Sequence, residues 1–281
     1  MTSFLLLAAL LVADGPKPVT LERVGRLEHP AIGEASGIVK SRKYPGVFWV
    51  HNDSGNAPRL FAVRRDGGLI REYMVKIPNV DWEDIAIDNA GHLYLGEIGN
   101  NEGRLPLRAV YMLDEPDPNL DTAPALKVIT ACYYLMSREN RFDAEGLVID
   151  GDRALIVSKT FDSRDAEVFS IPFAPPAPLM KPAKPKLTAT LRGFTSPVTG
   201  ASLTPDGKWL AVCATDLVGV YERSKDATWT PLFLQKFRPS DGQVEAITWD
   251  DADLILTGEG RQMLRLPAKV WQARHALDRT P

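Results

Sequence analysis

The chain has 281 residues, of which 33 are Lys or Arg and 36 are Asp or Glu, so its formal net charge is -3. This balance excludes the strongly basic surface with which proteins hold a nucleic-acid polymer or an anionic membrane. With 44% hydrophobic and 25% charged residues, the composition is that of a globular protein rather than a disordered chain. Two cysteines, Cys132 and Cys213, are too few for a disulfide scaffold or a cysteine zinc cluster.

An uninterrupted apolar run, Phe4 to Ala13, lies near the start of the sequence and is followed by Asp14, Gly15 and Pro16. A run of this length is too short to span a bilayer, which needs about 20 residues, so we expect no integral membrane segment. It suits the apolar part of a secretory signal peptide, and we predict one at residues 1–13. The protein would then be periplasmic or extracellular. A core strand or a wrongly assigned start codon are the alternatives.

A pair of short predicted strands recurs five times along the chain. The first strand of each pair starts near Ser36, Glu83, Glu145, Gly200 and Glu245, and the second ends near His51, Gly96, Ser158, Cys213 and Thr257. Successive starts are 45 to 62 residues apart, which leaves room for two more strands in each unit. Four-stranded units at this period predict a β-propeller.

The remaining strands of each unit can be placed in chain order. They are expected at 59–63 and 70–75, at 109–113 and 128–134, at 167–171 and 187–191, and at 218–221 and 232–235. The fifth unit offers one further strand at 263–266, and the segment 19–24 can supply its missing outer strand, which removes an open sheet edge.

We therefore predict an all-β fold, a five-bladed β-propeller of four-stranded blades whose last blade is closed by the N-terminal strand. The propeller would form a single domain at residues 18–268. A C-terminal tail at 269–281 would follow, with a short helix over 268–277. We expect a monomer.

Polar residues at the strand ends are predicted to meet at one mouth of the central channel, because the innermost strand starts and the next strand ends on the same face. The strand starts supply the metal-ligand candidates Ser36, Glu83, Glu145, Thr199 and Glu245, and the strand ends supply the catalytic candidates His51, Asp53, Glu97, Lys159 and Arg261. Carboxylates held this close cannot all stay ionised without a counter-charge. An oxygen-rich ligand set favours Ca²⁺ over Zn²⁺ as that counter-charge.

Two other interpretations of the carboxylates stay open. They could pair with Lys159, Arg261 and backbone amides, or be protonated, without any metal. Two of Glu83, Glu97 and Glu145 could also form the acid and base pair of a glycosidase.

Two functions compete at this point. The first is a hydrolase of phosphorylated or ester substrates, in which Ca²⁺ polarises an oxygen and orders water while Lys159 and Arg261 neutralise substrate charge. Asp53, Glu83 or Glu97 would then move protons, and His51 beside Ser54 or Ser158 is a further hydrolytic possibility. The second is a non-catalytic propeller with a structural cation that binds a glycan or a protein partner. A small-molecule or glycan ligand is expected at the channel mouth.

Several motifs resemble those of a group of secreted bacterial β-propeller proteins of unassigned function. The resemblance covers residues 30–265 and rests on Glu34-Ala-Ser-Gly37, Trp49-Val-His-Asn-Asp-Ser-Gly55, Asp81-Trp-Glu-Asp-Ile-Ala86, Leu95-Gly-Glu-Ile-Gly-Asn-Asn101 and Asp143-Ala-Glu-Gly-Leu147. It implies the fold and export but no activity.

A more distant resemblance is to the calcium-activated nucleotidases (apyrases), five-bladed propellers with one Ca²⁺ in the channel. That family has Ser, Glu, Glu, Ser and Glu at its inner-strand starts, where this chain has Ser36, Glu83, Glu145, Gly200 and Glu245. Gly200 departs from the pattern, and Thr199 would have to replace it. The resemblance implies a channel Ca²⁺, whereas the nucleotide-contacting residues of the family are not matched here.

Overall fold

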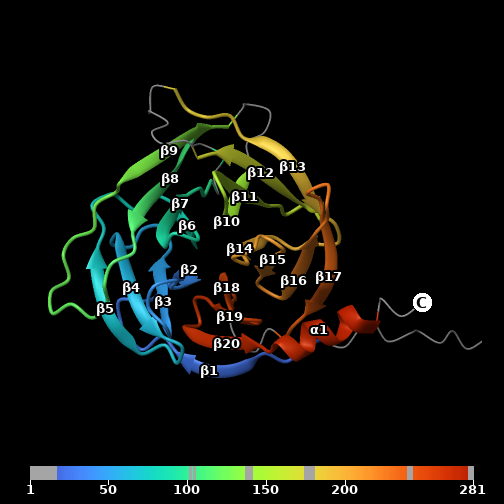
Figure 1. The fold of residues 1–281 in the computed structure, drawn as a ribbon, viewed down its shortest axis with the longest axis horizontal. Coiled ribbons are helices and arrows are strands. Elements are labelled where there is room, and N and C mark those ends of the chain that lie inside the picture. Colours follow the sequence, from blue (N-terminus) through green and yellow to red (C-terminus); the bar gives the residue numbers. More distant parts are fainter. Residues whose placement is uncertain are drawn as a thin grey trace, which may run out of the picture.

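The computed structural model describes residues 18–100, 103, 106–136, 142–173, 181–238 and 243–277, so the predicted signal peptide at 1–13 lies outside the described residues. The strands of this part form five antiparallel sheets of four strands each, arranged around a central channel (Figure 1). The predicted five-bladed β-propeller is therefore confirmed. In the same part of the chain, no helix has the length and apolar character to cross a membrane.

Each of the first four blades takes four consecutive strands, with the innermost strand first (Figure 1). Blade 1 contains β2 (Ala35–Lys40), β3 (Val47–Asn52), β4 (Arg59–Arg64) and β5 (Leu69–Met74), and blade 2 contains β6 (Trp82–Ile87), β7 (His92–Glu97), β8 (Leu107–Asp114) and β9 (Thr130–Leu135). Blade 3 contains β10 (Asp143–Asp150), β11 (Arg153–Lys159), β12 (Ala166–Pro172) and β13 (Lys186–Leu191), and blade 4 contains β14 (Val198–Leu203), β15 (Trp209–Ala214), β16 (Leu217–Arg223) and β17 (Trp229–Lys236).

Blade 5 joins the two ends of the propeller, as predicted. Its strands follow the order β1-β20-β19-β18, with β18 (Ala246–Asp250) innermost, then β19 (Asp253–Thr257), β20 (Gln262–Leu266) and β1 (Glu22–Arg26). Glu22 lies opposite Arg265 in the ladder. The outer strand begins a few residues later than the predicted 19–24, because Val19 instead pairs in parallel with Phe237, at the end of blade 4.

The turn between the first and second strand of each blade needs one residue in the left-handed backbone region. In blades 1 to 4 this residue is a glycine with φ between 59° and 83°, and in blade 5 it is Asp251 with φ 56°; the glycines are Gly46, Gly91, Gly151 and Gly207. Glycine and, less easily, Asp tolerate this conformation. The Asp- and Gly-rich turns of the sequence repeat therefore have a backbone cause.

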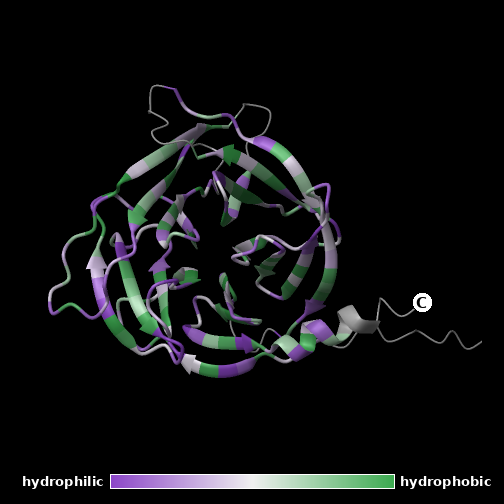
Figure 2. Cartoon of the chain, in the orientation of Figure 1, coloured by the Kyte–Doolittle hydropathy of each residue, from purple (hydrophilic) through white to green (hydrophobic). Residues whose placement is uncertain are grey.

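The hydrophobic core lies between neighbouring blades, and hydrophobic and hydrophilic segments alternate along the strands (Figure 2). Trp209 of blade 4 and Trp249 of blade 5 pack with Trp271 of helix α1 (Ala268–Leu277), at ring-centroid distances of 4.4 Å and 5.6 Å from Trp271. Trp271 is fully buried, and its indole N–H donates to the carbonyl of Ala252. The start of the predicted tail at 269–281 thus belongs to the folded core.

Candidate binding site at the acidic channel mouth

A β-bulge marks the start of the innermost strand in four blades. The bulged residues, passed over in the pairing with the second strand, are Ser36, Glu83, Glu145 and Thr199. In blade 5, Glu245 directly precedes β18, and its amide donates to the carbonyl of Thr257 (2.9 Å). A bulge re-aims a side chain out of the regular alternation of the strand. The five predicted metal ligands therefore share one structural position, and Thr199 rather than Gly200 is the member from blade 4.

These five side chains line a single pocket of about 330 Å³ at one end of the channel. Phe161, Thr215 and Gln243 complete part of its wall. Its charged lining consists of six carboxylates and one ammonium group: Glu34, Asp53, Glu83, Glu145, Glu245, Glu259 and Lys159. The sequence-based prediction that acidic side chains converge at one mouth is thus matched by the positions of these residues.

Lys159 is already engaged within the pocket. Its Nζ donates to Oε1 of Glu145, and the two side chains are only 17% and 7% exposed. The same Nζ lies 5.6 Å from the ring centroid of Phe161, whose side chain is 72% exposed at the rim. Burial raises the pKa of Glu145 to about 8 even though Lys159 lowers it. One lysine therefore does not balance the acidic lining.

Three carboxylates form a tighter group beside this pair. Oxygen atoms of Asp53, Asp81 and Glu83 all lie within 4.8 Å of one another. Glu83 is 2% exposed, and its Oε1 has no hydrogen-bond partner among the described residues. Burial, followed by the charge of Glu145, raises the pKa of Glu83 to about 11. A buried, unpaired carboxylate is costly, so this group requires a counter-charge, which is either a proton or a cation.

Gly99 leaves the space that this carboxylate group occupies. A Cβ at Gly99 would lie 2.0 Å from Oε1 of Glu83 and 2.6 Å from Oδ2 of Asp81. The loop that carries Asp81 is fixed by Glu97, which accepts hydrogen bonds from the amides of Val80 (3.3 Å) and Asp81 (2.5 Å). Glu97 is absent from the pocket lining, so its contacts indicate a positioning role rather than the predicted proton transfer.

His51 and Arg261 do not lie where the sequence analysis expected them. His51 is fully buried, its ring packs edge-on against Trp82 at 5.7 Å, and burial lowers its pKa to about 4. The guanidinium of Arg261 donates to the backbone carbonyls of Leu27 (2.9 Å) and His29 (2.8 Å). The prediction that both act at the channel mouth is corrected: His51 packs between blades 1 and 2, and Arg261 fastens the segment after β1.

The sequence analysis missed Asp84, which lies deeper in the channel. Its Oδ2 accepts hydrogen bonds from the amides of Leu147 (2.8 Å) and Ala201 (3.2 Å), and its Oδ1 accepts one from Ile85 (2.8 Å). These donors belong to blades 2, 3 and 4. One buried carboxylate therefore joins the inner strands of three blades. Two consecutive acids within an apolar strand, Glu83 and Asp84, were the available signal.

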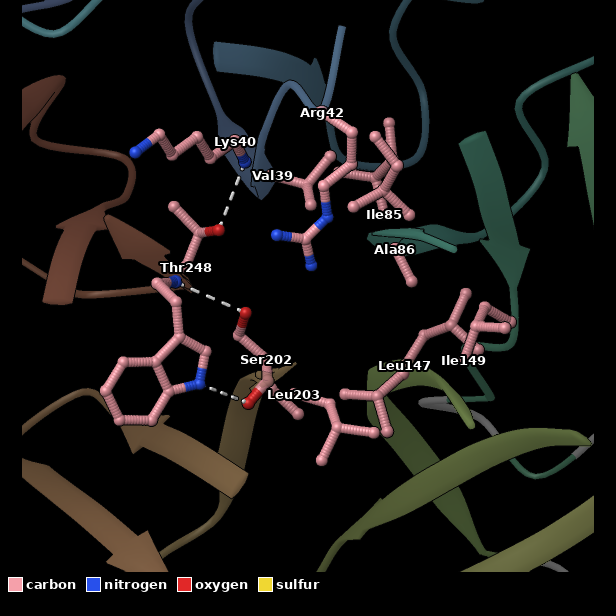
Figure 3. A pocket seen from close by; sticks show the side chains of 14 residues that line it. Val39, Lys40, Arg42, Ile85, Ala86, Leu147, Ile149, Ser202, Leu203 and Thr248 are labelled. Carbon is pink, nitrogen blue, oxygen red and sulfur yellow. Dashed lines mark hydrogen bonds between the residues drawn. The ribbon is translucent and has the colours of Figure 1, made fainter. Parts of the chain in front are cut away.

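Beyond Asp84 the channel continues as a narrow apolar throat of about 20 Å³. Side chains of Ile85, Leu147 and Leu203 line it, and the guanidinium of Arg42 points towards its centre (Figure 3). The acidic pocket and this smaller cavity share no lining residue, so they are separate spaces along the channel.

No family model and no curated protein match this sequence. Similar solved structures include a catalytically inactive virginiamycin B lyase from Staphylococcus aureus with quinupristin (TM-score 0.41, 12% identity, 85% of this chain and 67% of that chain). Another is a chain of the mitotic checkpoint complex (TM-score 0.42, 11% identity, 82% of this chain and 63% of that chain). A third is the propeller domain of Myceliophteria thermophila Cps50 (Swd1) (TM-score 0.49, 10% identity, 87% of this chain and 99% of that chain). These similarities carry no conclusion about function, and the strand pairing itself establishes the five-bladed propeller.

Proposed function

We propose that this propeller binds Ca²⁺ at its acidic channel mouth, with Asp53, Asp81 and Glu83 as the carboxylate ligands. The observation that carries the proposal is Oε1 of Glu83, which is buried, unpaired and grouped with two further carboxylates. Ca²⁺ takes six to eight oxygen ligands in flexible geometry, and this group offers oxygen atoms alone. When bound, the cation would supply the positive charge that buried Glu83 and the partly buried Asp53 and Asp81 require.

The ring of four bulge residues and Glu245, predicted from the sequence as metal ligands, is a less favourable ligand set. The hydroxyl of Ser36 donates to the carbonyl of Glu83 (2.6 Å), and the hydroxyl of Thr199 donates to the carbonyl of Val244 (2.9 Å). Glu145 is paired with Lys159. Those contacts join neighbouring blades or occupy the carboxylate, whereas Glu83 belongs to both sets and remains free to bind a cation.

The geometry supports a binding protein better than a hydrolase. His51 and Arg261, two of the five catalytic candidates, do not line the pocket, and Glu97 fixes a loop. Six carboxylates against one lysine also give the pocket the wrong sign for a phosphorylated substrate. We propose that Ca²⁺ organises a ligand-binding pocket in an exported protein, and the apolar run at residues 4–13 is the support for export.

Calcium titration by calorimetry, with native mass spectrometry of protein dialysed against Ca²⁺-free buffer, tests the cation site. We expect one Ca²⁺ per chain, lost in Glu83→Gln and Asp81→Asn and retained in Glu245→Gln. Glu28→Gln, which removes one exposed charge outside the pocket, is the matched control. At a Ca²⁺ concentration one hundred times Kd, binding should stabilise the fold by about 2.7 kcal/mol.

Two results would contradict this assignment. A protein that binds no Ca²⁺, with an unfolding midpoint that Ca²⁺ leaves unchanged, would remove the cation from the proposal. Loss of binding in Glu245→Gln with full binding in Asp81→Asn would instead assign the cation to the ring of bulge residues.

A further inference from the structure

We propose that the same pocket takes a small ligand with more than one ammonium group, of the aliphatic polyamine class. This inference rests on the channel mouth being a binding site, as in the proposed function, but it does not require the cation. It follows from the charge of the pocket wall, from the surroundings of Lys159, and from a buried acceptor and the size of the pocket.

The first argument is the excess of carboxylates on the pocket wall. Ca²⁺ at Asp53, Asp81 and Glu83 would leave the further carboxylates Glu245 and Glu259 on the pocket lining. Among the described side chains, neither of these two glutamates has an ion-pair partner within 4 Å. A ligand that carries several positive charges would balance this remaining acidity, whereas a phosphorylated or carboxylated ligand would add to it.

The second argument is that the pocket already surrounds one primary ammonium group. Nζ of Lys159 contacts the carboxylate of Glu145 and lies 5.6 Å from the ring of Phe161. An ammonium on a chain of methylene groups is also what an aliphatic polyamine presents. The ring of Phe161 is 72% exposed, so it can contact a second ammonium or the methylene chain of a ligand.

The third argument concerns an acceptor and the size of the pocket. In Ca²⁺-free protein, Glu83, which is more than nine-tenths buried and lines the pocket, offers an ammonium group an Oε1 that has no hydrogen-bond partner among the described residues. The volume of about 330 Å³ lies at the lower end of the range for small-molecule sites, roughly 300–1,000 Å³. This volume suits a compact ligand.

Three four-carbon probes that differ mainly in charge test the inference. Calorimetric titration at low ionic strength in Ca²⁺-free buffer would compare putrescine, butane-1,4-diol and succinate. We expect saturable binding of putrescine alone, weakened by added salt because its charges are screened. Glu245→Gln combined with Glu259→Gln should weaken putrescine at least tenfold, and Phe161→Leu should weaken it severalfold.

Control measurements separate this inference from the cation proposal. Glu28→Gln should bind putrescine as the parent protein does, and unchanged thermal unfolding would show that the Glu245→Gln and Glu259→Gln variant is folded. Absence of putrescine binding in a protein that still binds Ca²⁺ would overturn the ligand class and leave the cation site intact. Binding of the diol or of succinate as tightly as putrescine would overturn it equally. Putrescine binding without any Ca²⁺ binding would support the ligand class and remove the cation.

Discussion

Gly99 faces the carboxylate of Glu83 so closely that a Cβ on Gly99 would lie 2.0 Å from Oε1. The φ angle of Gly99 is not in the left-handed region, so its small size rather than its backbone freedom is what the structure uses. Position 99 therefore lacks a side chain because the carboxylates of Glu83 and Asp81 occupy that space, and not because a turn requires glycine.

The first prediction concerns Gly99→Ala. The added methyl group would displace Glu83 and Asp81, so we expect Ca²⁺ affinity to fall at least tenfold in a calorimetric titration. Gly151→Ala is the matched control, because Gly151 has φ 59° and no atom lies within 4 Å of the position that its Cβ would take. That variant should lose about 1 kcal/mol of stability through its backbone alone and keep full Ca²⁺ affinity. Equal affinity in both variants would contradict the role assigned to Gly99.

The second prediction concerns Asp84, whose carboxylate joins three blades. Burial raises the pKa of Asp84 well above its ordinary value, although amide donors from Leu147, Ile85 and Ala201 act in the opposite direction. Asp84→Ala would leave two of these amides, Leu147 and Ala201, without their inter-blade acceptor. An unsatisfied buried donor costs about 1–3 kcal/mol, so we expect a loss of about 2–6 kcal/mol.

Urea unfolding monitored by circular dichroism would measure this loss. Thr215→Ala, on the wall of the same channel mouth, should change stability far less, since no hydrogen bond joins its side chain to another described residue. Stability within 0.5 kcal/mol of the parent, roughly the range of a neutral surface change, would show that Asp84 does not hold the blades together.

The third prediction concerns the closure of blade 5. Arg265 pairs with Glu22 of β1 (2.9 Å) and with Asp253 (2.6 Å). We expect Arg265→Ala to lower the free energy of unfolding modestly at neutral pH, an effect that salt reduces. Arg164→Ala, which breaks an ion pair within a single exposed loop, should have no measurable effect.

The pH dependence of this loss follows from Asp253. Burial raises the pKa of Asp253. Hydrogen bonds from Arg265 and from the amide of Ala268 lower this pKa by more than burial raises it, so the net shift is downward. A carboxylate with a lowered pKa in the folded state contributes stability above its unfolded pKa, and that contribution is lost as the pH falls through the folded value. The difference between Arg265→Ala and the parent should therefore shrink below about pH 4. A difference that grows with acidity would contradict this assignment.

The fourth prediction concerns Trp271 in helix α1. Trp271→Ala removes a fully buried side chain that contacts Trp209 and Trp249, and such changes typically cost about 3–5 kcal/mol. Thermal unfolding monitored by circular dichroism avoids the loss of a fluorophore as a complication. Trp271→Phe should recover part of the stability. An unchanged midpoint in Trp271→Ala would mean that the helix is dispensable for the fold.

The blade count could be predicted from the sequence because each blade repeats a local signal. Two short apolar strands around an Asp- or Gly-containing turn recur at Gly46, Gly91, Gly151 and Gly207, where the backbone itself requires a left-handed residue. The same repetition predicted which residues line the channel mouth, since each bulge occurs at the same point of the repeat.

The residues that complete the site could not be predicted in this way, because their roles depend on contacts between blades. His51 ends its strand at the predicted place, but its side chain turns to the interface with Trp82 instead of the channel. Asp84 and Glu83 are consecutive acidic residues of one strand, but only the folded structure shows that Asp84 accepts hydrogen bonds from amides of other blades. Phe161 follows Lys159 by only two residues, but its place in the pocket wall depends on the conformation of the loop after β11, which lies outside the repeat.

The bulges at the channel mouth separate the ligand-facing positions from the hydrogen-bonded frame. The residues at 36, 83, 145 and 199 are passed over by the strand pairing, so their side chains can change without shifting the register of any blade. Simultaneous randomisation of Glu83, Glu145 and Glu245, with Ser36 and Thr199 kept because their hydroxyls join neighbouring blades, should therefore yield many folded variants with different pocket linings. The scaffold offers a compact surface for selecting new small-molecule specificities.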